Sequence, residues 1–266
     1  MTTLDGHRAR KRFGQNFLVD HHVIERIVAA INPRADDNLV EIGPGQGALT
    51  GPLLAANPHL TAIELDRNLI HLLRQKFTDY PAFQLMEQDA LKFDFTSLAD
   101  RGPLRIVGNL PYNISTPLIF HLLAHERVVR DMHFMLQREV VERLAAAPGS
   151  KAYGRLSVVV QYLCQVDFVF SVPPGAFVPA PKVESAIVRL CPHEHKSLTA
   201  VDPPLLFELV RQSFQQRRKT LRNNLKIWSD RYDLDDLPLD LGRRPETLAV
   251  DEFVTLSNQL ARQHDR

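Results

Sequence analysis

The chain has 266 residues, of which 44% are hydrophobic and 24% are charged, and its formal net charge is +1. This length fits one domain of ordinary size together with a smaller one. No apolar run reaches membrane-spanning length and the N-terminus lacks an apolar signal core, so we expect a protein of the reducing cytoplasm without membrane contact. The small net charge excludes a uniformly basic surface, so any nucleic-acid contact must come from local clusters.

The two cysteines, Cys164 and Cys191, belong to no Cys-x-x-Cys motif and to no Cys/His array. A disulfide framework and a zinc site are therefore not expected. The eleven histidines show no metal-ligand spacing either. His121 and His125 share one face of an expected helix but have no third ligand nearby, so we expect no metal.

The chain opens with a basic arm in which Arg10, Lys11 and Arg12 precede the aromatic residues Phe13 and Phe17. Basic side chains of this kind contact nucleic-acid phosphates, although a solvated tail is the simpler alternative. The aromatic residues can anchor the segment to a folded surface. We therefore predict that these three basic residues contact nucleic-acid phosphates.

After this arm, β-rich runs alternate with helical stretches, a pattern typical of a mainly parallel sheet covered by helices. We expect strands at residues 38–42, 60–64, 82–86, 104–108, 132–136, 167–172 and 185–191. Helices are expected at residues 48–56, 67–76, 116–125, 138–146 and 154–164, and a proline-rich loop at residues 172–181.

Acidic and glycine residues follow the first three expected strands. The sequence Glu41-Ile42-Gly43-Pro44-Gly45 closes the first strand, and its glycines let a ligand approach the backbone at a helix N-terminus. Glu64 ends the second strand, where a carboxylate can accept the ribose hydroxyls, and Asp89 follows the third, where it can accept from an adenine amine. Because the carboxyl ends of parallel strands meet at one edge, an adenosine-containing ligand is expected there. NAD and S-adenosylmethionine both satisfy this pattern.

The fourth strand is followed by Asn109-Leu110-Pro111-Tyr112. An adenine N6 amine is a poor nucleophile, and the Asn109 oxygen and the Leu110 carbonyl could accept its two hydrogens. Pro111 biases Leu110 away from the helical region, and Tyr112 could stack on the base. An ordinary turn after a buried strand is the alternative. The four residues favour methyl transfer over hydride transfer.

A change of composition after Pro192 predicts a domain boundary, which gives domains at residues 1–192 and 193–266. The second domain is expected to be helical. Its basic residues are spaced for a common helix face that contacts nucleic-acid phosphates, with ordinary helix-surface charges as the alternative. These residues are Arg217, Arg218, Lys219 and Arg222.

Seven motifs in one order make the chain resemble the ribosomal RNA adenine dimethyltransferases, and in particular their bacterial small-subunit branch. They are RKRFGQNFL at 10–18, EIGPG at 41–45, IELD at 63–66, NLPYNIS at 109–115, YGRLS at 153–157, PAPKVES at 179–185 and QRRK at 216–219. The resemblance implies a Rossmann-like class I methyltransferase with a mostly parallel seven-stranded α/β sheet and a small all-helical C-terminal domain.

The resemblance also implies an activity and its partners. Two methyl groups would pass from S-adenosylmethionine to the N6 amine of each of two adjacent adenines, in a hairpin loop near the 3′ end of 16S rRNA. The substrate would be the small (30S) ribosomal subunit during its biogenesis, and the enzyme would be a monomer. The implied cofactor contacts are Asn16, Leu18, Gly43, Glu64, Asp89 and Asn109.

Two alternatives stay open at this point. The first is a 23S rRNA adenine methyltransferase of the macrolide-resistance type, against which the motifs at 153–157 and 217–219 argue. The second is an assembly checkpoint that chiefly binds immature small subunits, with methylation secondary. A DNA adenine methyltransferase would more usually have a second proline in place of Leu110.

Overall fold

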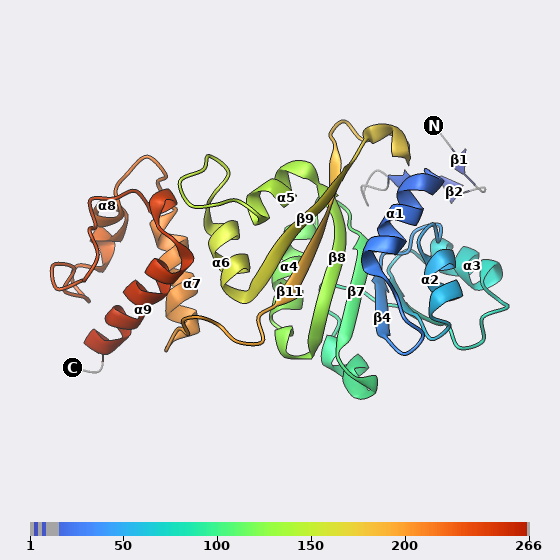
Figure 1. Cartoon of the computed structure of the whole chain (residues 1–266), viewed down its shortest axis with the longest axis horizontal. Helices are drawn as coiled ribbons and strands as arrows, with labels where there is room; N and C mark the ends of the chain where they lie inside the picture. Colours follow the sequence, from blue (N-terminus) through green and yellow to red (C-terminus); the bar gives the residue numbers. More distant parts are fainter. Residues whose placement is uncertain (1–2, 5–6, 9–15, 265–266) are drawn as a thin grey trace. The chain divides into compact units, whose positions relative to one another are not determined.

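The computed structural model describes residues 3–4, 7–8 and 16–264, which form two compact units (Figure 1). The first unit comprises residues 1–141 and 167–192, and the second comprises residues 142–166 and 193–266. One of the boundaries between the two units thus lies after Pro192, where the sequence analysis expected a domain boundary. The two-domain scheme was incomplete, however, because residues 142–166 group with the second unit.

The sheet has seven strands in the order β6-β5-β4-β7-β8-β11-β9. Strands β4 to β8 pair in parallel, and β11 is antiparallel to β8. This confirms the expected mostly parallel sheet of seven strands. The strands are β4 (Asn38–Ile42), β5 (Thr61–Glu64), β6 (Gln84–Glu87), β7 (Leu104–Asn109), β8 (Val129–Gln137), β9 (Cys164–Val172) and β11 (Ser185–Pro192).

Two of the helices in the first unit begin at an aspartate that caps them. Asp20 accepts a hydrogen bond from the Val23 backbone N–H at 3.1 Å and caps α1, and Asp66 caps α3 in the same way through the Asn68 N–H. Helix α1 and the short strands β3 and β10 were not expected from the sequence. The helices and remaining short elements are α1 (His21–Ile31), α2 (Thr50–Ala56), η2 (Phe95–Arg101), α3 (Arg67–Lys76), α4 (Ser115–Leu123), η3 (Glu126–Val128), α5 (Arg138–Leu144), η4 (Pro174–Ala176), β1 (Thr3–Leu4), β2 (His7–Arg8), β3 (Phe17–Leu18) and β10 (Phe177–Val178).

Helices α1 and α2 share a core with the sheet. The buried apolar residues of α1 recur at helical spacing and include Ile24, Ile27 and Ile31. They belong to one buried cluster with Leu53 of α2 and Leu39 of β4. Burying these side chains fixes α1 against the strands that carry the glycine loop.

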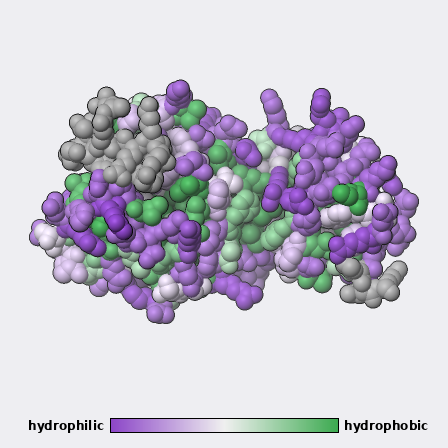
Figure 2. Space-filling model, turned by 180° about the vertical axis from the view of Figure 1, so that it is seen from behind, coloured by the Kyte–Doolittle hydropathy of each residue, from purple (hydrophilic) through white to green (hydrophobic). Residues whose placement is uncertain are grey.

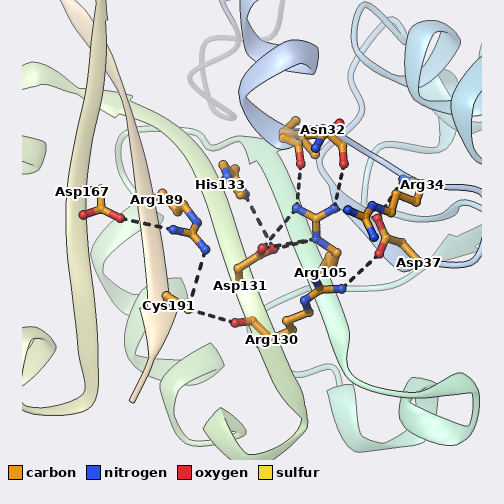
Figure 3. Close-up of polar contacts among 11 residues, drawn as sticks. Asn32, Arg34, Asp37, Arg105, Arg130, Asp131, His133, Asp167, Arg189 and Cys191 are labelled. Carbon is orange, nitrogen blue, oxygen red and sulfur yellow. Dashed lines mark hydrogen bonds and ion pairs between the residues drawn. The ribbon is translucent and has the colours of Figure 1, made fainter. Parts of the chain in front are cut away.

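A buried charge network crosses the sheet beneath α1 (Figure 3). Arg105 of β7 is 7% exposed, and its guanidinium donates to Asp37 at 2.6 Å and to Asp131 at 3.0 Å. It also donates to the backbone carbonyls of Ile31, at 2.6 Å, and Asn32, at 3.2 Å, at the end of α1. Arginine has five N–H donors, and this arrangement gives all of them acceptors.

We expect Arg105→Met to destabilise the protein by about 3–5 kcal/mol, because it leaves the carboxylates of Asp37 and Asp131 buried without their main partner. Arg130→Met is the control, since Arg130 contacts Asp37 at 3.4 Å with a side chain that is 55% exposed. Arg130→Met should lower the free energy of unfolding by less than about 1 kcal/mol. Urea unfolding of both variants measures the difference, and equal losses would contradict the dominant role of Arg105.

The second unit is built from helices. They are α6 (Arg155–Leu163), α7 (Pro203–Ser213), α8 (Leu221–Leu225), η5 (Lys226–Trp228), η6 (Pro245–Thr247) and α9 (Val250–His264). On the face drawn in Figure 2, the surface of these helices is mostly hydrophilic. No helix in the described part of the chain has the length and apolar character needed to cross a membrane.

Residues 142–166 belong to this unit because several of their contacts are made to its later segments. The fully buried ring of Tyr153 lies 6.4 Å from the ring of Phe214, centroid to centroid. The Gly149 N–H donates to the Glu246 carbonyl at 2.6 Å. Such pairings join positions far apart in sequence, so composition alone did not reveal them.

Candidate functional site

A cavity of about 260 Å³ lies at the carboxyl ends of β4, β5 and β7 in the first unit. It is lined by every residue for which a catalytic or cofactor role was expected. These residues are Asn16, Leu18, Gly43, Glu64, Asp89, Asn109, Leu110, Pro111 and Tyr112. The structure thus brings together positions from four separate motifs and Asp89, and their individual roles stay predictions.

The glycine loop and Glu64 are joined by backbone hydrogen bonds. Gly43 has a positive φ of 65°, which favours glycine, and its N–H donates to the Ile63 carbonyl at 2.9 Å. Glu64 accepts from the N–H groups of Leu65 at 2.8 Å, Asp66 at 2.9 Å and Gly45 at 3.4 Å. Burial raises the pKa of the Glu64 carboxyl, and these three hydrogen bonds oppose that rise. The carboxylate is therefore held in a fixed orientation beside the cavity.

Close packing of β7 against β4 places Asn109 beside the glycine loop. A methyl group on Gly108 would lie 2.5 Å from the Ile42 carbonyl oxygen, so only glycine allows this approach. A methyl group on Gly43 would lie 4.0 Å from the Asn109 carbonyl oxygen. The cofactor loop and the expected catalytic turn are thus immediate neighbours.

The side-chain amide of Asn109 is oriented by the segment before α1. Its Nδ2 donates to the Asn16 carbonyl at 3.3 Å, and the Leu110 N–H donates to the Met135 carbonyl at 3.2 Å. Within residues 16–264, the Asn109 Oδ1 atom accepts no hydrogen bond from the protein. This oxygen is the acceptor that remains for an N–H group entering the cavity.

Phe177 lines the same cavity and was not expected there from the sequence analysis. The expected loop at 172–181 was partly wrong, because it contains η4 and the strand β10, which pairs with β3. Leu18 lies opposite Phe177 in this pair, and the Val19 N–H donates to the Ala176 carbonyl at 2.9 Å. The only sequence signal was an aromatic residue before a proline-rich stretch.

Tyr112 is half-buried, and hydrogen bonds hold both its side-chain hydroxyl and its backbone carbonyl. Its hydroxyl lies 2.7 Å from the Ser185 Oγ atom, and its carbonyl accepts from the Ser115 hydroxyl at 3.2 Å. Burial raises the pKa of the Tyr112 phenol, and the hydrogen bond to Ser185 opposes that rise. Ser185 was missed because its partner lies 73 positions away in the sequence.

Glu41, at the end of β4, is a second acidic residue of the cavity and was given no role of its own from the sequence. It is 2% exposed, and its Oε2 atom accepts from the Thr50 hydroxyl at 2.7 Å. Burial raises the pKa of Glu41 from its ordinary value of 4.5 to about 7, and the nearby charge of Glu64 adds to the rise.

The raised pKa of Glu41 predicts a dependence of stability on pH. The folded state holds this proton between about pH 4.5 and 7, whereas the unfolded state releases it. The stabilisation is therefore full below pH 4.5 and is lost as the pH rises through 7. Glu41→Gln removes the titration. Between pH 5 and pH 8 we therefore expect the free energy of unfolding of the variant to rise by about 2–3 kcal/mol relative to that of the wild type.

Urea unfolding at the two pH values measures this gain. Glu25→Gln, at an exposed position of α1, controls for the change in net charge. If the free energies of unfolding of Glu41→Gln and wild type differ by the same amount at both pH values, the raised pKa of Glu41 is contradicted.

The expected RNA-contacting residues fall into three groups. Arg10, Lys11 and Arg12 lie outside the described residues. Arg217 and Arg222 are engaged: the former donates to the carbonyls of Lys151 and Tyr153, and the latter contacts Asp235 at 2.7 Å. Arg218 and Lys219 are exposed and have no ion pair among the described residues.

The expectation that these residues share one helical region was wrong. Residues 214–220 form a turn between α7 and α8. The Asn224 side chain stabilises it, accepting from the Gln216 N–H at 3.0 Å and donating to the Gln216 carbonyl at 3.2 Å. Side-chain bonds to the backbone compete with helix formation, which explains the break.

Among the described residues, no group of three or more His, Cys, Asp or Glu side chains could hold a metal ion. The His121 ring bonds to the Phe93 carbonyl at 2.8 Å, and the His125 ring bonds to the His121 carbonyl at 2.9 Å. These contacts account for both rings without a metal.

The sheet order and the cavity at its carboxyl edge define the chain as a class I methyltransferase with a Rossmann-like fold. Two solved structures share this fold. A dimethyladenosine transferase from Plasmodium falciparum is 26% identical with a TM-score of 0.78, covering 93% of this chain and 98% of its own. The 23S rRNA methyltransferase ErmE is 25% identical with a TM-score of 0.72, covering 92% of this chain and 100% of its own.

The family follows from the sequence comparisons. The model of the ribosomal RNA adenine dimethylase family matches residues 6–261, and the chain belongs to this family. A curated relative, the ribosomal RNA small subunit methyltransferase A of Chromohalobacter salexigens, is 61% identical over 260 residues. The match covers 96% of this chain and 92% of that relative.

Proposed function

We propose that this protein transfers methyl groups from S-adenosylmethionine to the N6 amines of two adjacent adenines in a hairpin loop near the 3′ end of 16S rRNA. The products are N6,N6-dimethyladenosines in the small ribosomal subunit, made by a monomer in the cytoplasm during subunit biogenesis. The observation that carries the proposal is the placement of Asn109 to Tyr112 beside the glycine loop and Glu64 in one cavity. The small-subunit name of the relatives supports this acceptor over 23S rRNA.

The charge of the cavity favours S-adenosylmethionine over NAD. Its lining includes the acidic residues Glu41, Glu64, Asp66 and Asp89, and its described lining residues include no Lys, Arg or His. Such a site attracts a cation and repels a pyrophosphate. S-adenosylmethionine supplies a methyl group on a positively charged sulfonium, which is already a good leaving group.

The residues that would hold this cofactor are those that line the cavity at the strand ends. The Glu64 carboxylate would accept the ribose hydroxyls. Asp89 uses its Oδ1 atom to accept from the Leu91 N–H at 3.0 Å, which leaves Oδ2 for an adenine amine. Gly43 permits close backbone approach, while Asn16 and Leu18 close the cavity from the segment before α1.

The acceptor amine is activated by protein oxygens. The Asn109 Oδ1 atom and the Leu110 carbonyl accept hydrogen bonds from the two N–H groups of the amine. These hydrogen bonds bias the nitrogen toward tetrahedral geometry and direct its lone pair at the methyl group. Positive charge that develops on the nitrogen would be stabilised by these two dipoles, and each transfer is completed when the nitrogen releases one N–H proton to solvent. The rings of Tyr112 and Phe177, which both line the cavity, hold the base by stacking. Holding the amine in line with the methyl group supplies most of the rate acceleration.

We expect Asn109→Ala to abolish methyl transfer while the protein stays folded, because the side chain supplies one of the two acceptors. The assay uses labelled S-adenosylmethionine with unmodified small subunits, large subunits or duplex DNA, followed by mass spectrometry of the labelled nucleoside. Dimethyladenosine from small subunits alone, absent with Asn109→Ala, is the expected result. Asn68→Ala, at an exposed position of α3, is the control.

Two results would count against this proposal. Near-normal turnover by a folded Asn109→Ala protein would remove Asn109 from the mechanism. Label in large subunits or in DNA, with none in small subunits, would reassign the substrate.

RNA recognition is proposed to use phosphate contacts on two basic segments. Arg10, Lys11 and Arg12 form one, and the turn that carries Arg218 and Lys219 forms the other. Arg222 flanks this turn on α8, and Arg217 shapes it by holding the backbone at Lys151 and Tyr153. Structured RNA is recognised largely through its shape and its phosphates, which suits such a surface.

We expect the double variant Arg218→Ala/Lys219→Ala to bind small subunits more weakly and to reduce the slope of log affinity against log salt by about 1–2, because two phosphate contacts are lost. Arg211→Ala is the matched control, since Arg211 already pairs with Glu208. Filter binding at several salt concentrations gives both values. An unchanged affinity and slope would show that this turn does not face RNA.

A further inference from the structure

The Tyr112 hydroxyl and the Ser185 hydroxyl form an isolated pair beside the cavity, with 2.7 Å between the oxygens. We propose that Ser185 is a positioning residue that fixes the Tyr112 ring at the angle needed for stacking on the target base. This inference rests on the stacking role proposed above for Tyr112. Ser185 itself does not line the cavity, so it acts through the tyrosine.

Ser185 is well placed to act as a rigid anchor. It is fully buried at the start of β11, where it lies opposite Gln137 of β8 in the antiparallel ladder. The neighbouring residue Glu184 is held twice by Arg138, whose N–H donates to the Glu184 carbonyl at 2.9 Å and whose guanidinium contacts the carboxylate at 2.6 Å. The serine hydroxyl therefore sits on a backbone that is fixed on both sides.

The backbone of the catalytic turn is fixed independently of Ser185. The Ser115 hydroxyl donates to the Tyr112 carbonyl, and the Ile114 N–H donates to the Pro111 carbonyl at 3.1 Å. The freedom that remains to Tyr112 is rotation of its side chain about χ1 and χ2. A hydrogen bond at the far end of the ring removes this freedom, which is the specific contribution of Ser185.

The pair also explains why a tyrosine is useful where a phenylalanine could stack equally well. The ring supplies the stacking surface, and the hydroxyl supplies the attachment point. If the attachment is lost, the half-buried ring samples other rotamers, and the amine spends less time in line for transfer. The effect should appear in the rate of the chemical step rather than in RNA affinity, since the stacking ring is retained and the phosphate contacts proposed above lie elsewhere.

The experiment is a double-mutant cycle with Ser185→Ala, Tyr112→Phe and the combined variant, assayed for kcat and KM with small subunits. Each single variant removes the same hydrogen bond, so we expect each to lower kcat about tenfold with KM within about twofold of wild type. The combined variant should lose no more than either single variant. Ser185→Thr keeps a hydroxyl and should recover most of the lost rate.

Two further variants complete the design. Ser213→Ala removes another buried serine hydroxyl, which donates to the Leu209 carbonyl within α7, and should leave kcat unchanged. Tyr112→Ala removes the ring and should lower kcat more than Tyr112→Phe does. Thermal unfolding and affinity for S-adenosylmethionine, measured on every variant, separate loss of positioning from loss of folding.

The outcomes distinguish the inference from the function on which it rests. Wild-type kcat in Ser185→Ala, or losses that multiply to about a hundredfold in the combined variant, would overturn the positioning role. Wild-type activity in Tyr112→Ala would instead overturn the stacking role of the tyrosine. If Ser185→Ala does not fold, Tyr112→Phe still breaks the hydrogen bond from the less buried side, and a normal kcat in that variant would refute the inference.

Discussion

The buried guanidinium of Arg105 is the interaction on which the geometry of the site depends. Helix α1 and strand β7 lie alongside each other and are joined at both ends. At one end Arg105 donates to the last carbonyl of α1, that of Ile31, and at the other Asn109 donates to Asn16, shortly before α1 begins. The Asn109 amide, for which a catalytic role is proposed, is therefore aligned by two elements whose relative position is set by the ion pairs of Arg105 at the opposite edge of the sheet. Since a buried pair is costly to desolvate, its benefit here is fixed placement rather than stability alone.

The site must accept two substrates of opposite charge. The acidic lining of the cavity suits a cationic methyl donor, whereas an RNA strand is a polyanion. These demands are compatible if a single uncharged base enters the cavity and the phosphates remain on basic surface outside it. The stacking proposed for Tyr112 and Phe177 would hold the base without adding charge. In the proposed mechanism the acceptors of the amine are likewise carbonyl oxygens and not carboxylates, so no ionised group has to face the RNA backbone at the reacting atom.

Much of the fold could be predicted from the sequence because its signals are local. Strand β4 and helix α3 have the expected bounds, since each combines an apolar period with clear end signals such as the Asp66 cap. The strand-end residues of the site were found for the same reason. What escaped prediction depends on pairing between distant segments. Phe177 reaches the cavity through β10, Ser185 reaches the Tyr112 hydroxyl from β11, and residues 142–166 join the second unit through contacts with later helices. The turn at Arg217 was mistaken for helix because Asn224 acts on it from a later position.

The pairing of β3 with β10 joins residues 17–18 to residues 177–178, about 160 positions apart. During synthesis, a chain that has emerged only as far as β8 already contains the glycine loop, Glu64 and the catalytic turn. It still lacks Phe177, the partner strand of β3 and the serine that holds Tyr112. The wall of the cavity can close only after the sequence through β10 has left the ribosome, and Tyr112 gains its anchor only with Ser185. A nascent chain therefore remains without a finished site until nearly the whole sheet has been made, which ties the onset of activity to completion of the fold.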